Sequence, residues 1–444
     1  MHKLYSLLLA LVISVSMSFN FSLFAFASTA DGLGKNGDEA KAYFGIQTVI
    51  YTQGTVDSKE LKAVIEQAAI DATSKSPIMV YVSKGTINIK SAVVIPENVI
   101  LVSEDSVVYK RTGDDYMIKL KGAIFGGTFD GNSRGKNIIQ MVSTKATAKD
   151  KNMTVMNTVI KNSPVTGVQI NGDNYKYGKV IRNKITNCKL NGISVYRGGQ
   201  YEVIKDNKIL KIGSGSHGSG IDICSSNVGV ISNNEIDTVV GHGISTDPVS
   251  DSGRIRLGCK INKISDNIIK NTKHQGVYVE KNCKVSVMNN NKISNIKGCA
   301  LTVDKNAKVY SLSGNSFAKS KHSNITLNGK GSYIKIVKNN TVKNGYAAGI
   351  ALSSNAKMDI TGNGNAITGN KLNGIQMAKK SVLKIKGKTT ITKNRWGINM
   401  AKKAKAIIKK CTIKKNRAGA VYYIKGAVFK KSKCKIKGKV YKAK

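Results

Sequence analysis

Short segments in which apolar residues alternate with other residues fill most of the chain, and they recur with a period of about 22–28 residues and one longer interval. Each repeat has two halves, and the first is Asn-x-Ile or a close variant. Its copies begin at Asn183, Asn207, Asn234, Asn267, Asn291, Asn315, Asn340 and Asn365. The second half is Gly followed by Ile or Val, with copies that begin at Gly167, Gly192, Gly220, Gly243, Gly276, Gly349, Gly374 and Gly397. Alternation with a period of two predicts strands, and the regular recurrence predicts a repeat architecture.

A solenoid of stacked strands accounts for this pattern. Alternate side chains of a strand point to the same side, so one short coil carries an apolar face that it cannot enclose by itself. Stacking the coils at the strand spacing of about 4.8 Å buries these faces in one continuous cylinder. The sequence therefore predicts an all-β fold, a single-stranded right-handed parallel β-helix solenoid.

The two recurring polar and small residues have separate expected roles. The Asn precedes a strand, where its side-chain amide is expected to bond to the coils above and below in a ladder. The Gly is expected at a sharp corner, where a positive φ costs glycine little. The chain has only four prolines, which suits a wall in which nearly every N–H is bonded.

Other repeat architectures do not match the details. Leucine-rich repeats need a Leu-based consensus that this chain lacks, and propeller blades need about 40 residues per repeat. A left-handed hexapeptide solenoid needs a shorter period.

The N-terminal part predicts a capping helix. Residues Asp57 to Glu60 have the pattern of a capping box. After them, Leu61, Val64, Ile65, Ala68 and Ala72 form one apolar helical face. Such a helix is expected to close the N-terminal end of the cylinder, because solenoid ends need caps. We expect a signal peptide over 1–27, an N-terminal segment with the capping helix over 28–85, the β-helix over 86–424 and a Lys-rich C-terminal tail over 425–444.

The first residues have the pattern of a secretory signal. Lys3 precedes a largely apolar run that reaches Phe26, and Ala25 and Ala27 supply small residues for cleavage before Ser28. An uncleaved membrane anchor is the alternative, but serines and an asparagine interrupt the run. The sequence predicts an exported protein, secreted or associated with the cell surface or cell wall, without a membrane span after cleavage and monomeric.

The charge distribution predicts anionic partners. The formal net charge is +45. Asp359 is the only acidic residue after Asp304, whereas about half of all lysines and arginines lie after Asp304. Such a surface holds polyanions and releases them as salt rises. For an exported protein the expected partner is acidic polysaccharide or an anionic cell-wall polymer, and the chain has no recognisable nucleic-acid module. The alternative is that the lysines keep a β-rich surface soluble and protect its edges.

The seven cysteines do not predict a framework. Their number is odd, and their spacing follows no disulfide or zinc pattern. Cys283 and Cys299 are expected in or near the solenoid wall as small apolar residues.

Two motifs resemble pectate lyase-like and polygalacturonase-like proteins. The helix and strands that lead to Gly126-Gly127-Thr128-Phe129-Asp130-Gly131-Asn132 resemble the entry into their solenoid, and Gly241-His242-Gly243 resembles a polygalacturonase segment. The resemblance implies a right-handed β-helix that acts on polysaccharide. The order of the coils fits that family, so the neighbouring positions can be compared one by one.

The polygalacturonase residues themselves are absent. Asn191, Gly218 and Ser219 stand where those enzymes carry Asp, and Tyr278 and Glu280 stand where they carry Arg and Lys. Hydrolysis with inversion needs one carboxylic acid and a second carboxylate, which Asn191 and Ser219 cannot supply. The comparison therefore argues against a polygalacturonase.

The exterior of the coils from about 191 to 280 is the candidate site. In Gly-Ile-x-apolar the x residue faces outward, so Ser194, Asp222, Ser245, Tyr278 and Thr302 are expected to stack. A loose column of histidines beside them consists of His217, His242, His274 and His322. We expect catalytic roles for Asp222, His242, Tyr278, Arg254 and Arg256. We expect substrate-binding roles for His217, Asp247, His274 and Glu280.

The chemistry considered for this site is that of a polyuronate lyase or epimerase. Such an enzyme needs a base for the proton beside a carboxylate, and a positive charge or calcium to stabilise the enolate. The candidate bases or clamps are Arg254, Arg256, Lys273 and His242, and Tyr278 is the candidate proton donor to the leaving group. The candidate calcium ligands are Asp222, Asp247 and Asp251, but no calcium-ligand spacing is recognisable, so the cofactor and the metal ligands stay open.

Plainer interpretations of the same residues stay open as well. The histidines are also explained as exposed polar residues, Asp222 as the partner of a nearby lysine, and Arg254 and Arg256 as ordinary loop charges. Trp396, the only tryptophan, fits a sugar-stacking platform or a cover for a corner. The two functional hypotheses are an exported enzyme on acidic polysaccharide and a non-catalytic polyanion-binding solenoid of the cell surface or cell wall.

Overall fold

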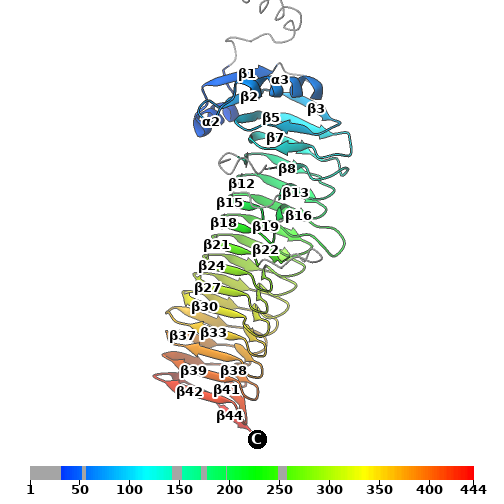
Figure 1. Ribbon diagram of the computed structural model, residues 1–444. Helices are drawn as coiled ribbons and strands as arrows, with labels where there is room; N and C mark the ends of the chain where they lie inside the picture. Colours follow the sequence, from blue (N-terminus) through cyan, green and yellow to red (C-terminus); the bar gives the residue numbers. More distant parts are fainter. Residues whose placement is uncertain (1–31, 53–56, 143–152, 172–177, 197, 249–257) are drawn as a thin grey trace, which may run out of the picture.

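The chain is an elongated right-handed parallel β-helix with two described helices at its N-terminal end (Figure 1). The computed structural model describes residues 32–52, 57–142, 153–171, 178–196, 198–248 and 258–444. Their strands form one 29-stranded sheet and one 15-stranded sheet. The predicted signal peptide lies outside the described residues. In the described part, no helix is both long and apolar enough to cross a membrane.

Each coil of the central region contributes three strands. One coil consists of β15 (Gln200–Lys205), β16 (Lys208–Ile212) and β17 (Ile221–Cys224). The following coils repeat this order with β18 (Asn227–Ser232), β19 (Glu235–Val239) and β20 (Ile244–Asp247), and then with β21 (Lys260–Ser265), β22 (Ile268–Thr272) and β23 (Val277–Val279). The first two strands of each coil belong to the 29-stranded sheet, in which the long strands β5 (Val99–Arg111) and β7 (Ala123–Asp130) run along both of its ladders.

The third strand of each coil belongs to the 15-stranded sheet, which carries the candidate site. Its strands before β17 are β4 (Val93–Ile95), β6 (Ile118–Leu120), β8 (Ile139–Val142), β11 (Val168–Asn171) and β14 (Ile193–Tyr196). After β23 follow β26 (Leu301–Val303), β29 (Ile325–Leu327), β32 (Ile350–Leu352), β35 (Ile375–Met377), β38 (Trp396–Met400), β41 (Gly419–Ile424) and β44 (Val440–Ala443). These strands pair in parallel and in register, so equivalent residues of successive coils stack.

The inward residues form one continuous apolar core. Buried side chains from Leu61 to Val421 belong to a single cluster, and Ile209, Ile236 and Ile269, which pair across three coils, are each 0% exposed. Burial of one such side chain contributes about 1.5–3 kcal/mol. The coils are therefore held by the apolar alternation that the sequence pattern indicates.

The predicted asparagine ladder is present and is buried. Its eight members are Asn183, Asn207, Asn234, Asn267, Asn291, Asn315, Asn340 and Asn365. In each link the side-chain Nδ2 donates to the Oδ1 of the next asparagine, as from Asn234 to Asn267 at 2.9 Å. The backbone N–H of Asn234 donates to the same oxygen at 3.0 Å. The ladder thus satisfies polar groups that the turn would otherwise leave buried without partners.

The explanation of the recurring glycines by a positive φ is wrong. The residue with positive φ at a neighbouring corner is the one before the ladder asparagine, such as Asp206 or Asn233. The recurring glycines instead leave room for the next coil. A Cβ on Gly220 would lie 2.5 Å from Cγ2 of Ile236 and 2.7 Å from the carbonyl oxygen of Gly243. Close approach between coils, and not backbone conformation, selects glycine there.

The predicted capping helix is α3 (Ser58–Asp71), and it closes the N-terminal end of the core. Asp57 accepts hydrogen bonds from the backbone N–H groups of Lys59 and Glu60 at 2.7 and 2.9 Å, and the Glu60 carboxylate accepts from the N–H of Asp57 at 2.9 Å. The buried face of α3 consists of Leu61, Val64, Ile65 and Ala68, which belong to the main core cluster. The helix therefore covers the apolar end of the cylinder.

The sequence analysis did not predict the second helix, α2 (Lys35–Phe44). It packs beside β5 with a small apolar cluster of its own that includes Ala40, Val102 and Phe125. The carboxylate of Glu104 accepts from the backbone N–H groups of Asn36 and Gly37 in the first turn of α2. A carboxylate at this end of a helix is favourable for both hydrogen bonding and the helix dipole.

The segment 425–444 continues the two sheets. It contains β42 (Val428–Ser432), β43 (Lys435–Ile436) and β44, which pair with the preceding coil in the same parallel order. A second asparagine ladder precedes it on another corner, with links from Asn324 to Asn370, from Asn370 to Asn394 and from Asn394 to Asn416. The regular coil thus extends through the Lys-rich part of the chain.

Replacing Asn267 with alanine is expected to lower the free energy of unfolding by about 2–4 kcal/mol, because buried groups of Asn234 and Asn291 lose their partner. The measurement is the shift of the chemical denaturation curve. Asn227→Ala is the control, because Asn227 is exposed and lies on the neighbouring strand β18. Equal losses of unfolding free energy in the two variants would contradict a particular contribution of the ladder to stability.

Candidate functional site

The register of the 15-stranded sheet determines which predicted residues come together. Asp222 on β17 pairs with Ser245 on β20, which pairs with Tyr278 on β23. Two residues further along these strands, Cys224 pairs with Asp247. In the next coil, Glu280 directly follows the last residue of β23. Successive coils lie about 4.8 Å apart. Residues distant in sequence therefore form two short rows on the outer face.

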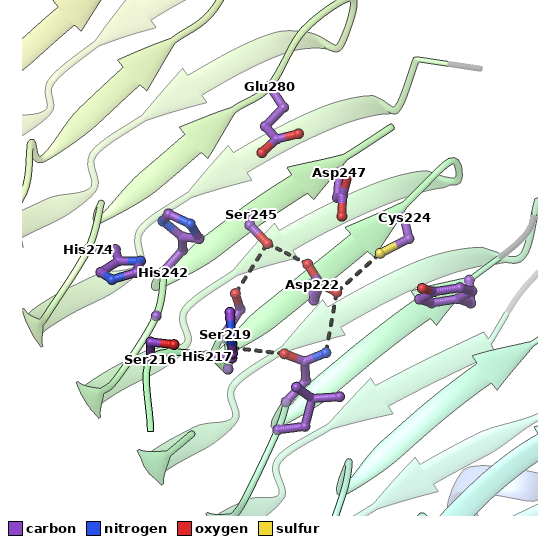
Figure 2. A pocket seen from close by; sticks show the side chains of 15 residues that line it. Ser216, His217, Ser219, Asp222, Cys224, His242, Ser245, Asp247, His274 and Glu280 are labelled. Carbon is purple, nitrogen blue, oxygen red and sulfur yellow. Dashed lines mark hydrogen bonds between the residues drawn. The ribbon is translucent and has the colours of Figure 1, made fainter. Parts of the chain in front are cut away.

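A pocket of about 320 Å³ opens on this face. Figure 2 shows its side chains, which come from four successive coils. Six of the nine predicted site residues line it: His217, Asp222, His242, Asp247, His274 and Glu280. The other lining residues are Leu190, Asn191, Tyr196, Ser216, Gly218, Ser219, Cys224, Gly241 and Ser245.

Asp222 lies at the centre of a hydrogen-bond network (Figure 2). Ser245 donates to its Oδ1, and Asn191 Nδ2 and Cys224 Sγ donate to its Oδ2 at 3.3 and 3.1 Å. Ser219 Oγ lies 3.2 Å from Ser245 Oγ, and the N–H of Ser219 donates to Asn191 Oδ1 at 2.8 Å. The contacts of Asp222 are thus with uncharged side chains, and they fix its orientation.

Burial raises the pKa of two carboxyl groups of the pocket, those of Asp222 and Glu280. Burial raises the pKa of Asp222, while hydrogen bonds from Ser245 and Cys224 oppose this shift. Burial, and then the nearby charge of Asp247, raise the pKa of Glu280 to about 8. At neutral pH a carboxyl group with such a pKa is mostly protonated, so Glu280 is a hydrogen-bond donor as well as an acceptor.

His242 is held as a neutral ring. Burial, and then the charge of the neighbouring His274, lower the pKa of His242 to about 4. Its Nδ1 accepts the backbone N–H of Gln275 at 3.2 Å, so the ring proton is assigned to Nε2. In this tautomer His242 presents a donor and not a base. The ring of His274 lies 5.3 Å away between centroids, and its side chain is exposed.

Tyr278 lies beside the pocket and not among its lining residues. Its ring is 5.0 Å from that of His242 between centroids, but its hydroxyl donates to Asp304 Oδ2 at 3.1 Å. Burial, and then Glu280 and Asp304, raise the pKa of Tyr278, so its hydroxyl keeps its proton. Its ring therefore lies beside the His242 ring, whereas its hydroxyl is bound to Asp304.

The remaining predicted residues are placed as follows. Arg254, Arg256 and Asp251 lie outside the described residues. Lys273 and His322 are exposed and do not line the pocket. Asn191 and Ser219 were considered only as departures from a polygalacturonase, yet they line the pocket and order Asp222. Their positions in the repeat, immediately before the recurring glycines, are the sequence signal that could have identified them.

No lysine or arginine lines the pocket among the described residues. In the same part of the chain, no group of three or more His, Cys, Asp or Glu side chains is placed to hold a metal ion. The calcium site suggested by Asp222, Asp247 and Asp251 stays a prediction, because Asp251 is not described. The described pocket itself offers uncharged donors and acceptors, three carboxyl groups and three imidazoles.

Sequence comparison identifies the repeat region. Residues 137–317 match the sequence model of the family described as "Right handed beta helix region", and residues 305–429 match that of "Periplasmic copper-binding protein (NosD)". Together with the observed topology, these matches define the chain as a right-handed parallel β-helix protein. No curated protein sequence matches it.

Solved β-helix structures resemble the chain only distantly. The A-module of the Azotobacter vinelandii mannuronan C-5 epimerase AlgE4 is 15% identical, with 78% of this chain and 94% of that one covered and a TM-score of 0.49. A mutant of the periplasmic alginate epimerase AlgG is 12% identical over 94% of this chain and 98% of that one, with a TM-score of 0.47. The Dettilon tailspike protein is 15% identical over 92% and 72%, with a TM-score of 0.45. At these scores the likenesses carry no argument about function.

The donors in the NosD-like segment do not fit a copper site. Between residues 305 and 429 the chain has one histidine, His322, one cysteine, Cys411, and the methionines Met358, Met377 and Met400. Cys411 and the three methionines are buried in the apolar core, while His322 is exposed. Copper needs imidazole or sulfur ligands that converge, and the exposed histidine cannot join sulfur atoms that are enclosed in the core.

Compared with the native protein, the Glu280→Gln variant is expected to gain stability as pH rises from about 5 to 9. The pKa of Glu280 is raised from 4.5 to about 8, so the folded state loses stability when pH rises above the unfolded pKa and ionisation becomes costly. Glutamine removes that cost. The expected gain at the alkaline end is about 1–2 kcal/mol, less than the full shift implies, because solvent screens the half-buried group.

The measurement is the difference between the two unfolding free energies as a function of pH, in which the other titrating groups cancel. Glu202→Gln is the control, because Glu202 lies outside the pocket, where its carboxylate pairs with Lys179. A difference that does not depend on pH would contradict the raised pKa of Glu280.

Proposed function

We propose that this chain is an exported β-helix protein that engages an acidic polysaccharide along the outer face of the 15-stranded sheet. We further propose that the pocket around Asp222 acts on one uronate unit of that polymer, as a lyase or an epimerase. The observation that carries the proposal is the gathering of uncharged donors and protonation-prone carboxyl groups in one pocket of a strongly basic protein.

The chemistry of the pocket suits a sugar carboxylate. Three ionised carboxylates would repel such a ligand, but Glu280 with a pKa of about 8 is mostly protonated at neutral pH, and burial raises the pKa of Asp222. A protonated carboxyl group and the Nε2–H of His242 can both donate to the substrate carboxylate. Hydrogen bonds of this kind would also stabilise the enolate that forms when the adjacent proton leaves.

Proton abstraction then needs an acceptor at the pocket mouth. His242 is a donor in the described tautomer, so we assign the base to His274, which lines the pocket and is exposed. In a lyase, the carbon-bound proton passes to His274, the electron pair forms a carbon–carbon double bond, and the glycosidic oxygen leaves with a proton from Glu280. In an epimerase, a proton returns to the same carbon from the opposite face.

Charge outside the pocket supports retention of the polymer. With 71 basic against 26 acidic residues, the surface attracts anionic chains from a distance and increases their local concentration. The description of the NosD family as periplasmic supports export. Arg254 and Arg256 follow β20 in the sequence, and these arginines are proposed as further contacts to the substrate.

The direct test is solvent exchange in deuterium oxide. Polygalacturonate, alginate and glycosaminoglycans are incubated with the purified protein, and deuterium at the carbon beside the carboxylate is measured by nuclear magnetic resonance. Unsaturated products are followed by their ultraviolet absorbance. An epimerase places a solvent deuteron on this carbon, whereas a lyase leaves a carbon–carbon double bond there and no hydrogen. Deuterium incorporation and ultraviolet absorbance therefore separate the two reactions.

His274→Gln and Asp222→Asn are expected to reduce the rate of deuterium exchange or of unsaturated-product formation by about 100-fold or more, because they remove the base and the ordered carboxyl group. His322→Gln is the matched control, because His322 is also exposed in the histidine column but lies outside the pocket. It should leave both rates unchanged.

Absence of both deuterium incorporation and unsaturated products on all three polymers, together with salt-sensitive retention of the same polymers, would refute the catalytic proposal. It would favour the second candidate, a non-catalytic polyanion-binding solenoid of the cell surface or cell wall. The specific observation in its favour is the Lys-rich C-terminal third, which binds anions by charge without a shaped site.

A further inference from the structure

The outer row that begins at the pocket ends in a stack of aromatic rings. Strand pairing continues the row of outward residues through Asp222, Ser245, Tyr278, Thr302, Thr326, Ala351, Gln376, Asn399, Tyr422 and Tyr441. The five residues between Tyr278 and Tyr422 are small or uncharged. The face therefore offers a path along the solenoid axis that ends at Tyr422 and Tyr441.

Three rings form this aromatic stack. Trp396 and Tyr422 have centroids 5.5 Å apart, and Tyr422 and Tyr441 are stacked at 5.4 Å with an interplanar angle of 18°. Tyr441 is 41% exposed, and the other two rings are half-buried. Large aromatic surfaces in partial contact with water provide flat apolar faces for a ligand.

The local sequence keeps the indole in place. Gly419 of the next coil lies under Trp396, and a Cβ at this position would be 2.3 Å from the Trp396 ring. Its φ of +153° also disfavours other residues there. Trp396 is thus held over the neighbouring strand and close to Tyr422, as part of the face.

One lysine lies over the aromatic stack, and other cations lie on the coil of Trp396 or on the coils before it. The Nζ of Lys439 lies 4.8 Å from the centroid of Tyr441. On the adjoining corner, Lys321 and Lys371 lie over the two sides of the Tyr346 ring at 4.4 and 4.1 Å. Arg395, next to Trp396, is exposed. The only acidic residue of this third, Asp359, accepts a hydrogen bond from Tyr333 on the other sheet at 2.9 Å.

We infer that the aromatic stack of Trp396, Tyr422 and Tyr441 is a second binding site for an acidic polysaccharide, in which sugar rings pack against the exposed parts of the aromatic rings and their carboxylates meet nearby cations such as Lys439. The site is distinct from the Asp222 pocket. Eight coil steps separate Asp222 from Tyr422, which is about 38 Å at the spacing of parallel strands. The inference extends the proposed function, but binding at the stack does not require chemistry in the pocket.

The combination of rings and cations favours this ligand over others. The C–H faces of a sugar ring fit flat aromatic surfaces, and lysine or arginine beside them adds attraction for a carboxylate. A neutral sugar would use the rings alone, and a polyanion without sugar-ring stacking would use the cations alone. Selectivity for an acidic oligosaccharide requires both.

Trp396 itself reports on binding, because it is the only tryptophan in the chain. Oligogalacturonates and oligomannuronates are titrated into the full-length protein while tryptophan fluorescence is followed, and affinities are measured by calorimetry. We expect saturable fluorescence changes that weaken as salt rises. Tyr422→Ala and Tyr441→Ala should each weaken binding about tenfold. Lys439→Gln should weaken binding less than the tyrosine variants do, and it should make the affinity less dependent on the salt concentration.

Tyr310→Ala is the matched control, because Tyr310 is also 41% exposed but lies on the 29-stranded sheet. Asp222→Asn should leave the fluorescence change intact, which separates this inference from the proposed function. Unchanged affinity in both folded tyrosine variants would overturn the second site. The second site would also be overturned if a neutral oligosaccharide bound as tightly as the acidic ones. The same holds if single-stranded DNA bound as tightly and Tyr422→Ala did not weaken that binding. Absence of both proton exchange and unsaturated products, with intact binding at Trp396, would instead refute the pocket chemistry alone.

Discussion

Parallel pairing in register between successive coils is the constraint on which the rest of this molecule depends. Every residue lies about 4.8 Å from its equivalents in the coils before and after it. A residue type that stacks well on itself is therefore favoured at its position throughout the solenoid. Asparagine does so through paired amides, isoleucine through packing, and glycine by allowing the next coil to approach.

The same constraint creates the unusual electrostatics of the outer face. Asp247, Glu280 and Asp304 occupy equivalent places at the ends of three successive third strands, so their carboxyl groups stack at the coil spacing. Burial and the neighbouring charge of Asp247 raise the pKa of Glu280 to about 8. Asp222 is kept in place by uncharged partners instead. A protein with a formal net charge of +45 thus contains one acidic pocket with protonation-prone groups.

Differences in the outward residues of successive coils create separate chemical surfaces on the outer face. The coils that contain Asp222, Ser245 and Tyr278 carry different residues at each outward position, and the pocket forms where they meet. Further along the same row the residues become small and uncharged, and then aromatic at Tyr422 and Tyr441. The scaffold therefore presents separate chemical surfaces on one continuous face without any change of fold.

The sequence by itself determined the coil, the asparagine ladder and the capping helix α3, because these depend on periodicity and on contacts between close neighbours. It also indicated which coils would carry Asp222, His242 and Glu280, since one motif recurs in every coil. It did not predict α2, because the contacts of α2 with Glu104 and Phe125 link distant segments. Only the tertiary structure decided the steric role of the glycines, the donor state of His242 and the place of Asn191 and Ser219 beside Asp222. Those properties depend on distances, burial and hydrogen bonds between coils, which the repeat pattern does not encode.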